Sequence, residues 1–84
     1  MTYQVILPKS VQKDLDRLPN DIAARILDAL SALEAQPRPA GCKKMRGEKA
    51  WRIRVGDYRV IYEINDKILH VFVVTVGHRR EVYR

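Results

Sequence analysis

Three stretches in the second half of the chain have the patterns of β-strands, and the turns between them are too short to hold any other element. The stretches are residues 50–55, 58–64 and 68–76. The first two alternate apolar and polar side chains, and the third is almost wholly apolar. Gly56-Asp57 and Asn65-Asp66-Lys67 favour tight turns, so the pattern predicts a small, mainly antiparallel sheet. The apolar third strand is expected to be flanked on both sides and covered on both faces.

The first part of the chain supplies one more strand and two helices. Residues 3–7 read as a short strand, and Pro8 suits the first turn of a helix because its missing N–H has no partner to lose there. This helix is expected to run to about Leu18. Pro19 ends it, and Asn20-Asp21 are expected to cap the second helix.

Both predicted helices carry an apolar stripe. Val11, Leu15 and Leu18 recur at helical spacing in the first, and the second has a wide stripe over residues 22–33. Helices this short are marginal alone, so they must pack on the sheet. The expected fold is α+β in the order β-α-α-β-β-β, with a helical hairpin on one face of a twisted sheet and the first strand beside the last. Residues 40–49 are expected to form a basic loop.

Size and composition restrict the chain further. With 84 residues there is room for one domain, residues 1–84, with a single core. Cys42 is the only cysteine, which excludes an internal disulfide and a thiolate-rich metal site and favours a reducing compartment. No apolar run approaches the ~20 residues of a membrane span. We therefore expect a cytoplasmic protein with no membrane partner, no metal and no cofactor.

The formal net charge of +6 points to an anionic partner, either a nucleic acid or an acidic protein. Residues 1–40 contain five basic and five acidic side chains, so the whole excess lies in residues 41–84. The second half is therefore the expected binding half.

Alternation places three arginines on one side of the predicted sheet. If the apolar side chains of residues 50–55 face the helices, Arg52 and Arg54 face away from them. Arg59 joins them from the next strand, and Glu63 is the one acid that the same parity adds. Two interpretations follow: a solvated outer face, or an anion site in which a bound anion offsets the repulsion between the guanidinium groups.

Four segments of the second half form an ordered set of motifs. They are Lys43-Lys44-Met45-Arg46-Gly47, Trp51-Arg52-Ile53-Arg54-Val55, Asp57-Tyr58-Arg59-Val60-Ile61-Tyr62 and Gly77-His78-Arg79-Arg80-Glu81-Val82-Tyr83. With the order of elements, they resemble the RelE/ParE superfamily of toxins, most closely its RelE branch. The resemblance implies a ribosome-dependent endoribonuclease that cuts mRNA in the A site without metal. In that reaction a ribose 2′-OH attacks the adjacent phosphate.

The resemblance also implies roles for individual residues. Five match the catalytic positions of the family: Arg52, Arg54, Arg59, Arg79 and Tyr83. We expect five others to contact RNA: Lys43, Lys44, Arg46, His78 and Arg80. Fixed cations can stabilise the developing charge on phosphorus, for which Arg59 and Arg79 are the best placed, while Tyr83 stacks on a base or orients the 2′-OH.

The general base stays open. Relatives carry lysines where this chain has Arg52 and Arg54, and an arginine remains protonated at any workable pH. His78, Tyr83 or a group of the ribosome are the alternatives, and histidine is the residue type whose ordinary pKa lies nearest to neutral pH. His70 lies inside the apolar strand and is interpreted as a structural histidine with satisfied hydrogen bonds.

The partners follow from the same resemblance. We expect the ribosome, mRNA and a cognate antitoxin in a hetero-oligomer, the antitoxin binding through an acidic, amphipathic helix across the sheet or the helix pair. Two alternative functions remain: a non-nucleolytic toxin of the ParE type that acts on a protein target such as gyrase, and a basic nucleic-acid-binding module without catalysis.

Overall fold

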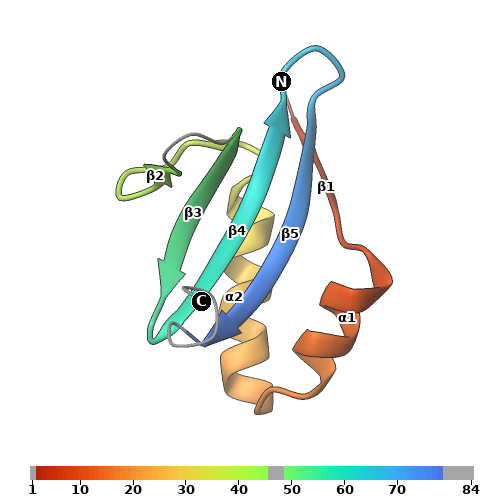
Figure 1. The fold of residues 1–84 in the computed structure, drawn as a ribbon, viewed down its shortest axis with the longest axis vertical. Helices are drawn as coiled ribbons and strands as arrows, with labels where there is room; N and C mark the ends of the chain where they lie inside the picture. Colours follow the sequence, from red (N-terminus) through yellow and green to blue (C-terminus); the bar gives the residue numbers. More distant parts are fainter. Residues whose placement is uncertain (1, 46–48, 79–84) are drawn as a thin grey trace.

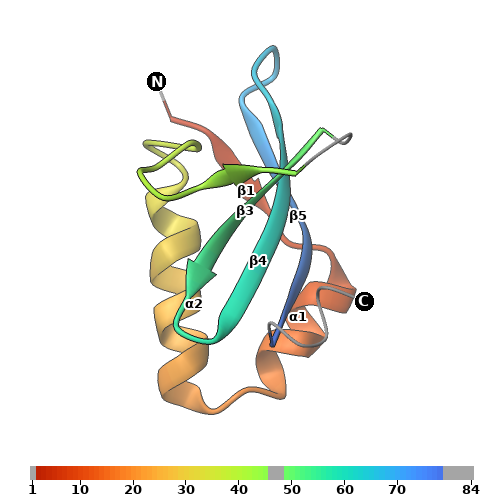
Figure 2. The same ribbon diagram turned by 60° about the vertical axis from the view of Figure 1, so that its left-hand side comes forward.

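A five-stranded sheet in the order β1-β5-β4-β3-β2 carries two helices on one face (Figures 1 and 2). The computed structural model describes residues 2–45 and 49–78. The elements are β1 (Gln4–Ile6), α1 (Lys9–Asp16), α2 (Asn20–Ala32), β2 (Lys43–Lys44), β3 (Ala50–Val55), β4 (Tyr58–Asn65) and β5 (His70–His78). The predicted α+β class and the placement of both helices on one face are confirmed.

The first strand lies beside the last, as the sequence predicts. β1 pairs in parallel with β5, Val5 opposite Val71, whereas all other strand pairs are antiparallel. Just before the strand, the Tyr3 amide donates to the Glu34 carbonyl across 2.7 Å. That bond ties the start of the chain to the segment that follows α2.

Prolines set where both helices begin. Pro8 and Pro19 occupy the N-cap positions of α1 and α2, and neither end has a side-chain capping hydrogen bond. The expected capping by Asn20-Asp21 is therefore wrong, because Asn20 is already helical and the Pro19 carbonyl accepts from the Ala23 amide at 2.9 Å. Neither helix in the described part of the chain is long and apolar enough to span a membrane.

The turn between β3 and β4 fixes their register. Gly56, its first residue, has a φ of +60°, the positive value that a type II′ hairpin turn requires at this position. Ile53 then lies opposite Val60, and Arg54 lies opposite Arg59. The register thus sorts the two strands into an apolar face and a basic face.

A β-bulge interrupts the pairing of β4 with β5. Ile61 pairs with Thr75 and Tyr62 with Val73, so Val74 has no partner of its own. The extra residue shifts the alternation, which lets Val73 and Val76 both enter the core although they are three positions apart.

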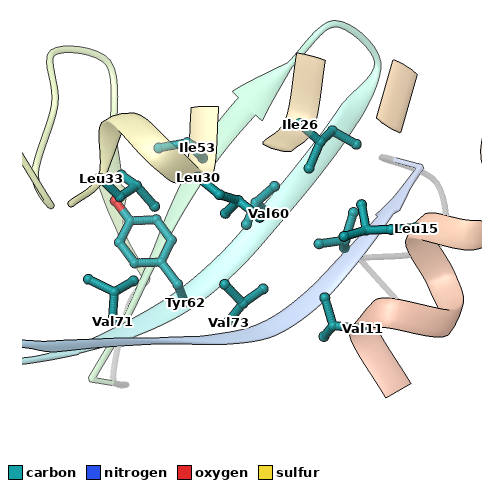
Figure 3. Packing of buried hydrophobic residues seen from close by; sticks show 11 residues of the cluster. Val11, Leu15, Ile26, Leu30, Leu33, Ile53, Val60, Tyr62, Val71 and Val73 are labelled. Atoms are coloured by element: carbon teal, nitrogen blue, oxygen red, sulfur yellow. The ribbon is translucent and has the colours of Figure 1, made fainter. Parts of the chain in front are cut away.

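The core lies between the helices and the inward face of the sheet (Figure 3). The buried cluster consists of Val11, Leu15, Ile26, Leu30, Leu33, Ile53, Val60, Tyr62, Val71, Val73 and Val76. Tyr62 is fully buried, and its hydroxyl donates to the Pro37 carbonyl at 2.8 Å. Burial raises the pKa of this phenol, with a smaller contribution from Cys42, so the hydroxyl stays protonated as a donor.

Two expectations about the sheet need correction. Residues 40–49 are not only a loop, because Lys43 and Lys44 form β2 against β3. The last strand begins at His70, two residues later than expected, and only one of its faces is covered, since Phe72 and Val74 are exposed on the other. We call the sheet face turned away from the helices the open face; Figure 1 views the sheet from this side, with α2 behind the strands.

Two neighbouring residues of α2 test the packing. Ile26 is fully buried, whereas Leu27 is 46% exposed. Ile26→Ala should lower the free energy of unfolding by about 2–5 kcal/mol because it opens a cavity in the core. Leu27→Ala, the matched control, should lower it by less than about 1 kcal/mol. Urea denaturation followed by circular dichroism measures both, and equal effects would mean that α2 packs through another face.

Candidate nucleic-acid interface

Three arginines gather on the open face, where the alternation places them. Arg54 and Arg59 are direct cross-strand partners, and Arg52 lies opposite Ile61, two positions further along β4. Opposite residues of antiparallel strands have Cβ atoms only about 4.5–5.5 Å apart, so these side chains are neighbours. Like charges placed so close are unfavourable unless counter-charge is near.

A short strand extends this basic row across the sheet. Lys43 of β2 pairs with Arg52 of β3. These side chains, with Gly41, Ile53, Arg54 and Arg59, line a hollow of about 190 Å³, which we call the arginine hollow. Four basic side chains from three strands therefore surround one small space. Its size and charge suit an oxyanion such as a phosphate.

The backbone holds one of these arginines in place. Arg54 Nε donates a hydrogen bond to the Gly56 carbonyl at 3.0 Å, so one N–H donor of the guanidinium is used by the β3–β4 turn. A guanidinium has five N–H donors, so its terminal nitrogens keep theirs for a ligand. The turn that sets the strand register thus also orients a side chain of the hollow.

The structure does not bring all the predicted site residues together. Lys44 lies opposite Trp51, one position out of phase with Lys43, so it faces away from the hollow. His78 lies opposite Tyr58 on the helix side, where the two rings meet edge to face at 5.6 Å. The bulge at Val74 accounts for this placement of His78, because it shifts the alternation of β5. Four other predicted site residues lie outside the described residues: Arg46, Arg79, Arg80 and Tyr83.

The surroundings of the two histidines also differ from expectation. His78 borders a second hollow, of about 400 Å³, together with Asp14 and Arg17 of the first helical segment. His70 packs edge to face on Phe72, with ring centroids 5.5 Å apart. Its Nδ1 is buried and makes no hydrogen bond within the described residues, so the expectation of a satisfied structural histidine is wrong. Residues 2–45 and 49–78 contain no group of three His, Cys, Asp or Glu side chains placed to hold a metal ion.

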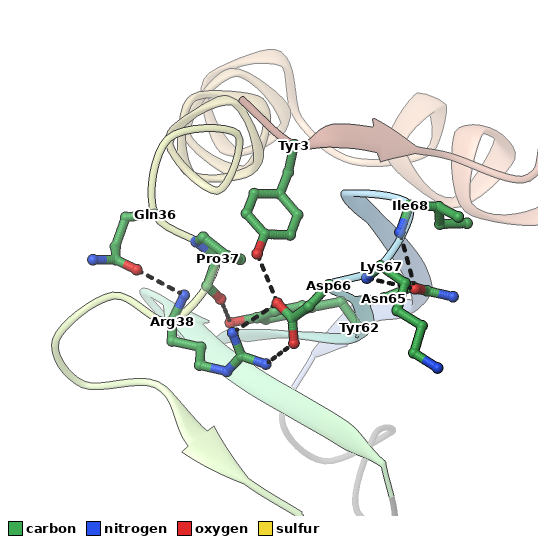
Figure 4. A network of polar contacts seen from close by, with 9 residues as sticks. All are labelled: Tyr3, Gln36, Pro37, Arg38, Tyr62, Asn65, Asp66, Lys67 and Ile68. Carbon is green, nitrogen blue, oxygen red and sulfur yellow. Dashed lines mark hydrogen bonds and ion pairs between the residues drawn. The ribbon is translucent and has the colours of Figure 1, made fainter. Parts of the chain in front are cut away.

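A polar cluster that the sequence analysis missed anchors the segment leading to β2 (Figure 4). Arg38 donates to both carboxylate oxygens of Asp66, at 2.9 and 3.2 Å, and the Tyr3 hydroxyl donates to the same carboxylate at 2.6 Å. The Arg38 guanidinium also lies over the Trp51 ring, 5.2 Å from its centroid. Arg38 thereby joins the β4–β5 turn to β3. It also anchors the segment between α2 and β2, which leads to Lys43.

These contacts shift the pKa values of two groups in the cluster, Asp66 and Tyr3. Hydrogen bonds from Arg38 and then Tyr3 lower the pKa of Asp66, and the hydrogen bond to Asp66 raises the pKa of Tyr3. Both shifts favour the protonation states that make the contacts, an ionised carboxylate and a neutral phenol.

The whole chain is similar to known toxins. A sequence profile described as the ParE toxin of the type II toxin–antitoxin system parDE matches residues 5–83. Toxin RelG of Mycobacterium tuberculosis (strain ATCC 25618 / H37Rv) is 34% identical over 87 residues, which cover 100% of this chain and 99% of that protein.

Solved structures agree with the sequence comparison. The archaeal RelE–RelB complex from Pyrococcus horikoshii OT3 contains a chain with a TM-score of 0.84 and 35% identity, covering 94% of this chain and 97% of that one. The RelBE2 toxin–antitoxin complex from Mycobacterium tuberculosis gives a TM-score of 0.82 at 30% identity, covering 94% and 100%. The chain therefore belongs to the RelE/ParE family of toxins of type II toxin–antitoxin systems. The resemblance inferred from the four sequence motifs is confirmed.

The Arg38–Asp66 cluster predicts a pH dependence of stability. The pKa of Asp66 lies below its ordinary value of 3.8, so the folded state binds this proton less tightly than the unfolded state. The stabilisation is therefore present above about pH 4 and is lost as the pH falls through the lower, folded-state pKa. It is small, because both side chains are partly exposed.

Asp66→Asn should lower the urea midpoint near neutral pH and reduce the loss of stability between about pH 5 and pH 2.5. Asp28→Asn, at an exposed position on α2, is the control and should leave the pH profile as in the wild type. If Asp66→Asn and the wild type lose stability in parallel, the ion pair does not form in solution.

Proposed function

We propose that this toxin is a ribosome-dependent endoribonuclease that cleaves mRNA by attack of a ribose 2′-OH on the adjacent phosphate. The arginine hollow is the observation that carries the proposal. Arg52, Arg54 and Arg59 line it with Lys43 on the open face of the sheet. Membership of the RelE/ParE family supports the assignment of this face as the site.

The proposed cleavage depends on groups that stabilise the negative charge of the transition state. When the 2′-OH attacks, negative charge grows on the phosphoryl oxygens, and cations already fixed around the phosphate stabilise it without reorganising. Arg54 and Arg59 approach the phosphate from facing positions on two strands. The products are a 2′,3′-cyclic phosphate and a free 5′-OH: the P–O5′ bond breaks as the P–O2′ bond forms, the 2′-OH proton passes to a base, and the leaving 5′ oxygen takes up a proton.

The position of His78 favours another source for that base. Its ring lies against Tyr58 on the helix side, whereas Arg59 projects from the open face. No arginine of the hollow can accept a proton at neutral pH. We therefore assign the base to Tyr83 or to a group of the ribosome; the second choice would make cleavage depend on the ribosome. Arg79 remains the proposed second stabiliser of the phosphorane.

Cleavage of a defined mRNA on paused ribosomes tests the reaction. Arg59→Ala should lower the single-turnover rate at saturating ribosomes by roughly 10²–10³ because one donor to the developing charge is lost. Lys43→Ala, in the same hollow, should mainly weaken binding and reduce the slope of its salt dependence by about one unit, with the saturated rate retained.

The chemistry of the RNA ends separates the mechanisms. Ends with 2′,3′-cyclic phosphate or 3′-phosphate, paired with 5′-OH, support attack by the 2′-OH. Recovery of 3′-OH and 5′-phosphate ends would rule that mechanism out. Should Arg59→Ala cleave at the wild-type rate once saturated, the arginine hollow is not the catalytic centre.

A toxin that acts on a protein target is the second candidate. The matching family profile is described as ParE, and this observation favours the alternative. In that case the wild type inhibits growth, no new mRNA ends appear on ribosomes, and purified gyrase loses supercoiling activity when the toxin is added. Ribosome-dependent mRNA cleavage with unaffected gyrase excludes this alternative.

We further propose that the cognate antitoxin lays an acidic, amphipathic helix across the open face. Exposed Phe72 and Val74 lie on the same face as the arginines, so an apolar stripe flanked by carboxylates complements it. The RelE–RelB neighbours are complexes of this kind of toxin with an antitoxin.

Val74→Asp on the toxin should therefore weaken the complex by at least about tenfold, because it places a charge against an apolar stripe and repels carboxylates. Leu27→Asp, an equally exposed apolar position on α2, is the control. Titration calorimetry with the coexpressed and separated antitoxin measures both. A complex that leaves Arg52, Arg54 and Arg59 fully exposed would contradict neutralisation by occlusion.

A further inference from the structure

A third hollow opens on the same sheet, at the other end of β4 from Arg59. It has a volume of about 520 Å³, and its lining includes Lys49, Glu63, Asn65, Lys67 and Phe72. Glu63 and Phe72 are cross-strand partners and share the open face with Arg59 by alternation along β4. This hollow combines an aromatic ring, a carboxylate, an amide and two ammonium groups, a set that the proposed reaction does not use.

The aromatic ring is exposed and packs against a neighbouring ring. Phe72 is 36% exposed on β5, between β1 and β4, and the His70 ring packs edge to face against it with the ring centroids 5.5 Å apart. A ring supported in this way offers an apolar surface to solvent. Flat aromatic surfaces on open β-sheets are the usual platforms on which proteins stack single-stranded bases.

The polar groups beside the ring are those that read the edge of a base. Asp66 also borders the hollow, but Arg38 and Tyr3 already bind its carboxylate. Within the described residues, no hydrogen bond or ion pair engages Glu63, so its carboxylate can accept from a ligand.

The amide and the two lysines complete the set. Asn65 Oδ1 accepts from the backbone amides of Lys67 and Ile68, at 3.0 and 3.2 Å. This holds the amide plane and keeps the NH₂ group as a donor. Lys49 and Lys67 place two cations at the hollow, where they offset the charge of Glu63 and attract a phosphate.

The distance to the arginine hollow fits one RNA strand. Glu63 and Arg59 are four residues apart on β4, which corresponds to about 13 Å along the strand. A short stretch of single-stranded RNA can therefore place a phosphate among the arginines and a nearby base on Phe72.

We propose that this hollow is a nucleobase subsite, in which Phe72 stacks a base near the cleaved phosphate and Glu63 selects bases with an exocyclic amino group. The subsite rests on the proposed function, because it takes its ligand from the RNA strand at the arginine hollow. A carboxylate accepts from the amino group of cytosine, adenine or guanine, whereas uracil offers none. The subsite disfavours uracil at this position.

Binding of RNA that cannot react tests the subsite separately from cleavage. The probe is a short, fully 2′-O-methylated oligonucleotide with one 2-aminopurine, which has no attacking 2′-OH and whose fluorescence falls when the base stacks. Wild type and Phe72→Tyr should quench the probe. Phe72→Ala and Phe72→Leu should lose the quenching and bind roughly 5- to 100-fold more weakly. Leu27→Ala, at an exposed apolar position on α2 away from the open face, is the control and should bind and quench as the wild type.

Base selection is measured with the same backbone. Methylated oligocytidine should bind at least about fivefold more tightly than oligouridine, and Glu63→Gln should reduce this difference. Thermal melts confirm that each variant is folded. Wild-type protein that fails to quench the probe, or Phe72→Ala that quenches as the wild type, overturns the subsite, and so does equal binding of cytidine and uridine.

The two proposals can fail independently. If the wild type quenches the probe through Phe72 but cuts no mRNA on ribosomes, the subsite stands and the proposed reaction is wrong. If the wild type cuts mRNA, and Phe72→Ala quenches the probe and cuts at the same bases as the wild type, the reaction stands and the subsite is wrong. If a peptide binds at Phe72 and RNA does not, the hollow binds a protein partner instead of a base.

Discussion

The register between β3 and β4 is the constraint on which both faces of the sheet depend. Ile53 pairs with Val60 on the helix side, and Arg54 pairs with Arg59 on the other. A slip of one residue would turn the arginines into the core and expose the apolar pair, which burial of the core forbids. The hydrophobic effect therefore positions the cations, although no cation contributes to the core. The repulsion between Arg54 and Arg59 is a cost that the packing of the opposite face offsets.

The second constraint is the bulge at Val74, which separates the groups that a regular strand would bring together. Without it, residues 72, 74, 76 and 78 of β5 would share one face. With it, Val76 enters the core and His78 follows to the helix side, while Phe72 and Val74 stay on the open face. The bulge thus leaves an apolar strip beside the arginines and removes a titratable ring from them. The chemistry of the open face depends on this one extra residue as much as on the arginines.

Patterns of apolar residues along the chain were enough to predict both helices, every strand except β2, the arginine face and the neighbouring positions of the first and last strands. They failed where distant segments decide the local structure. Nothing in the repeat of apolar residues marks Val74 as a bulge, since every residue around it is apolar or small. The pairing of Lys43 with Arg52 depends on the course of the backbone between α2 and β2. The ion pair between Arg38 and Asp66, which are 28 residues apart in the sequence, fixes that course. Ion pairs of this kind leave no periodic trace in a sequence.

Under the proposed function, an open face that combines fixed cations with exposed apolar groups would bind RNA and an antitoxin through the same atoms. Guanidinium groups contact phosphates and carboxylates with the same planar geometry, and an exposed ring packs on a base or on an aliphatic side chain. A neutralising partner on this face needs no change of toxin conformation, because occupancy alone excludes the substrate. Competition of this kind is reciprocal by thermodynamic linkage: whatever affinity RNA loses in the presence of the antitoxin, the antitoxin loses in the presence of RNA. Under the proposed function, ribosomes that supply the substrate would therefore draw free toxin away from its antitoxin in proportion to the RNA affinity, and the exposed Phe72 ring would contribute to both sides of that balance.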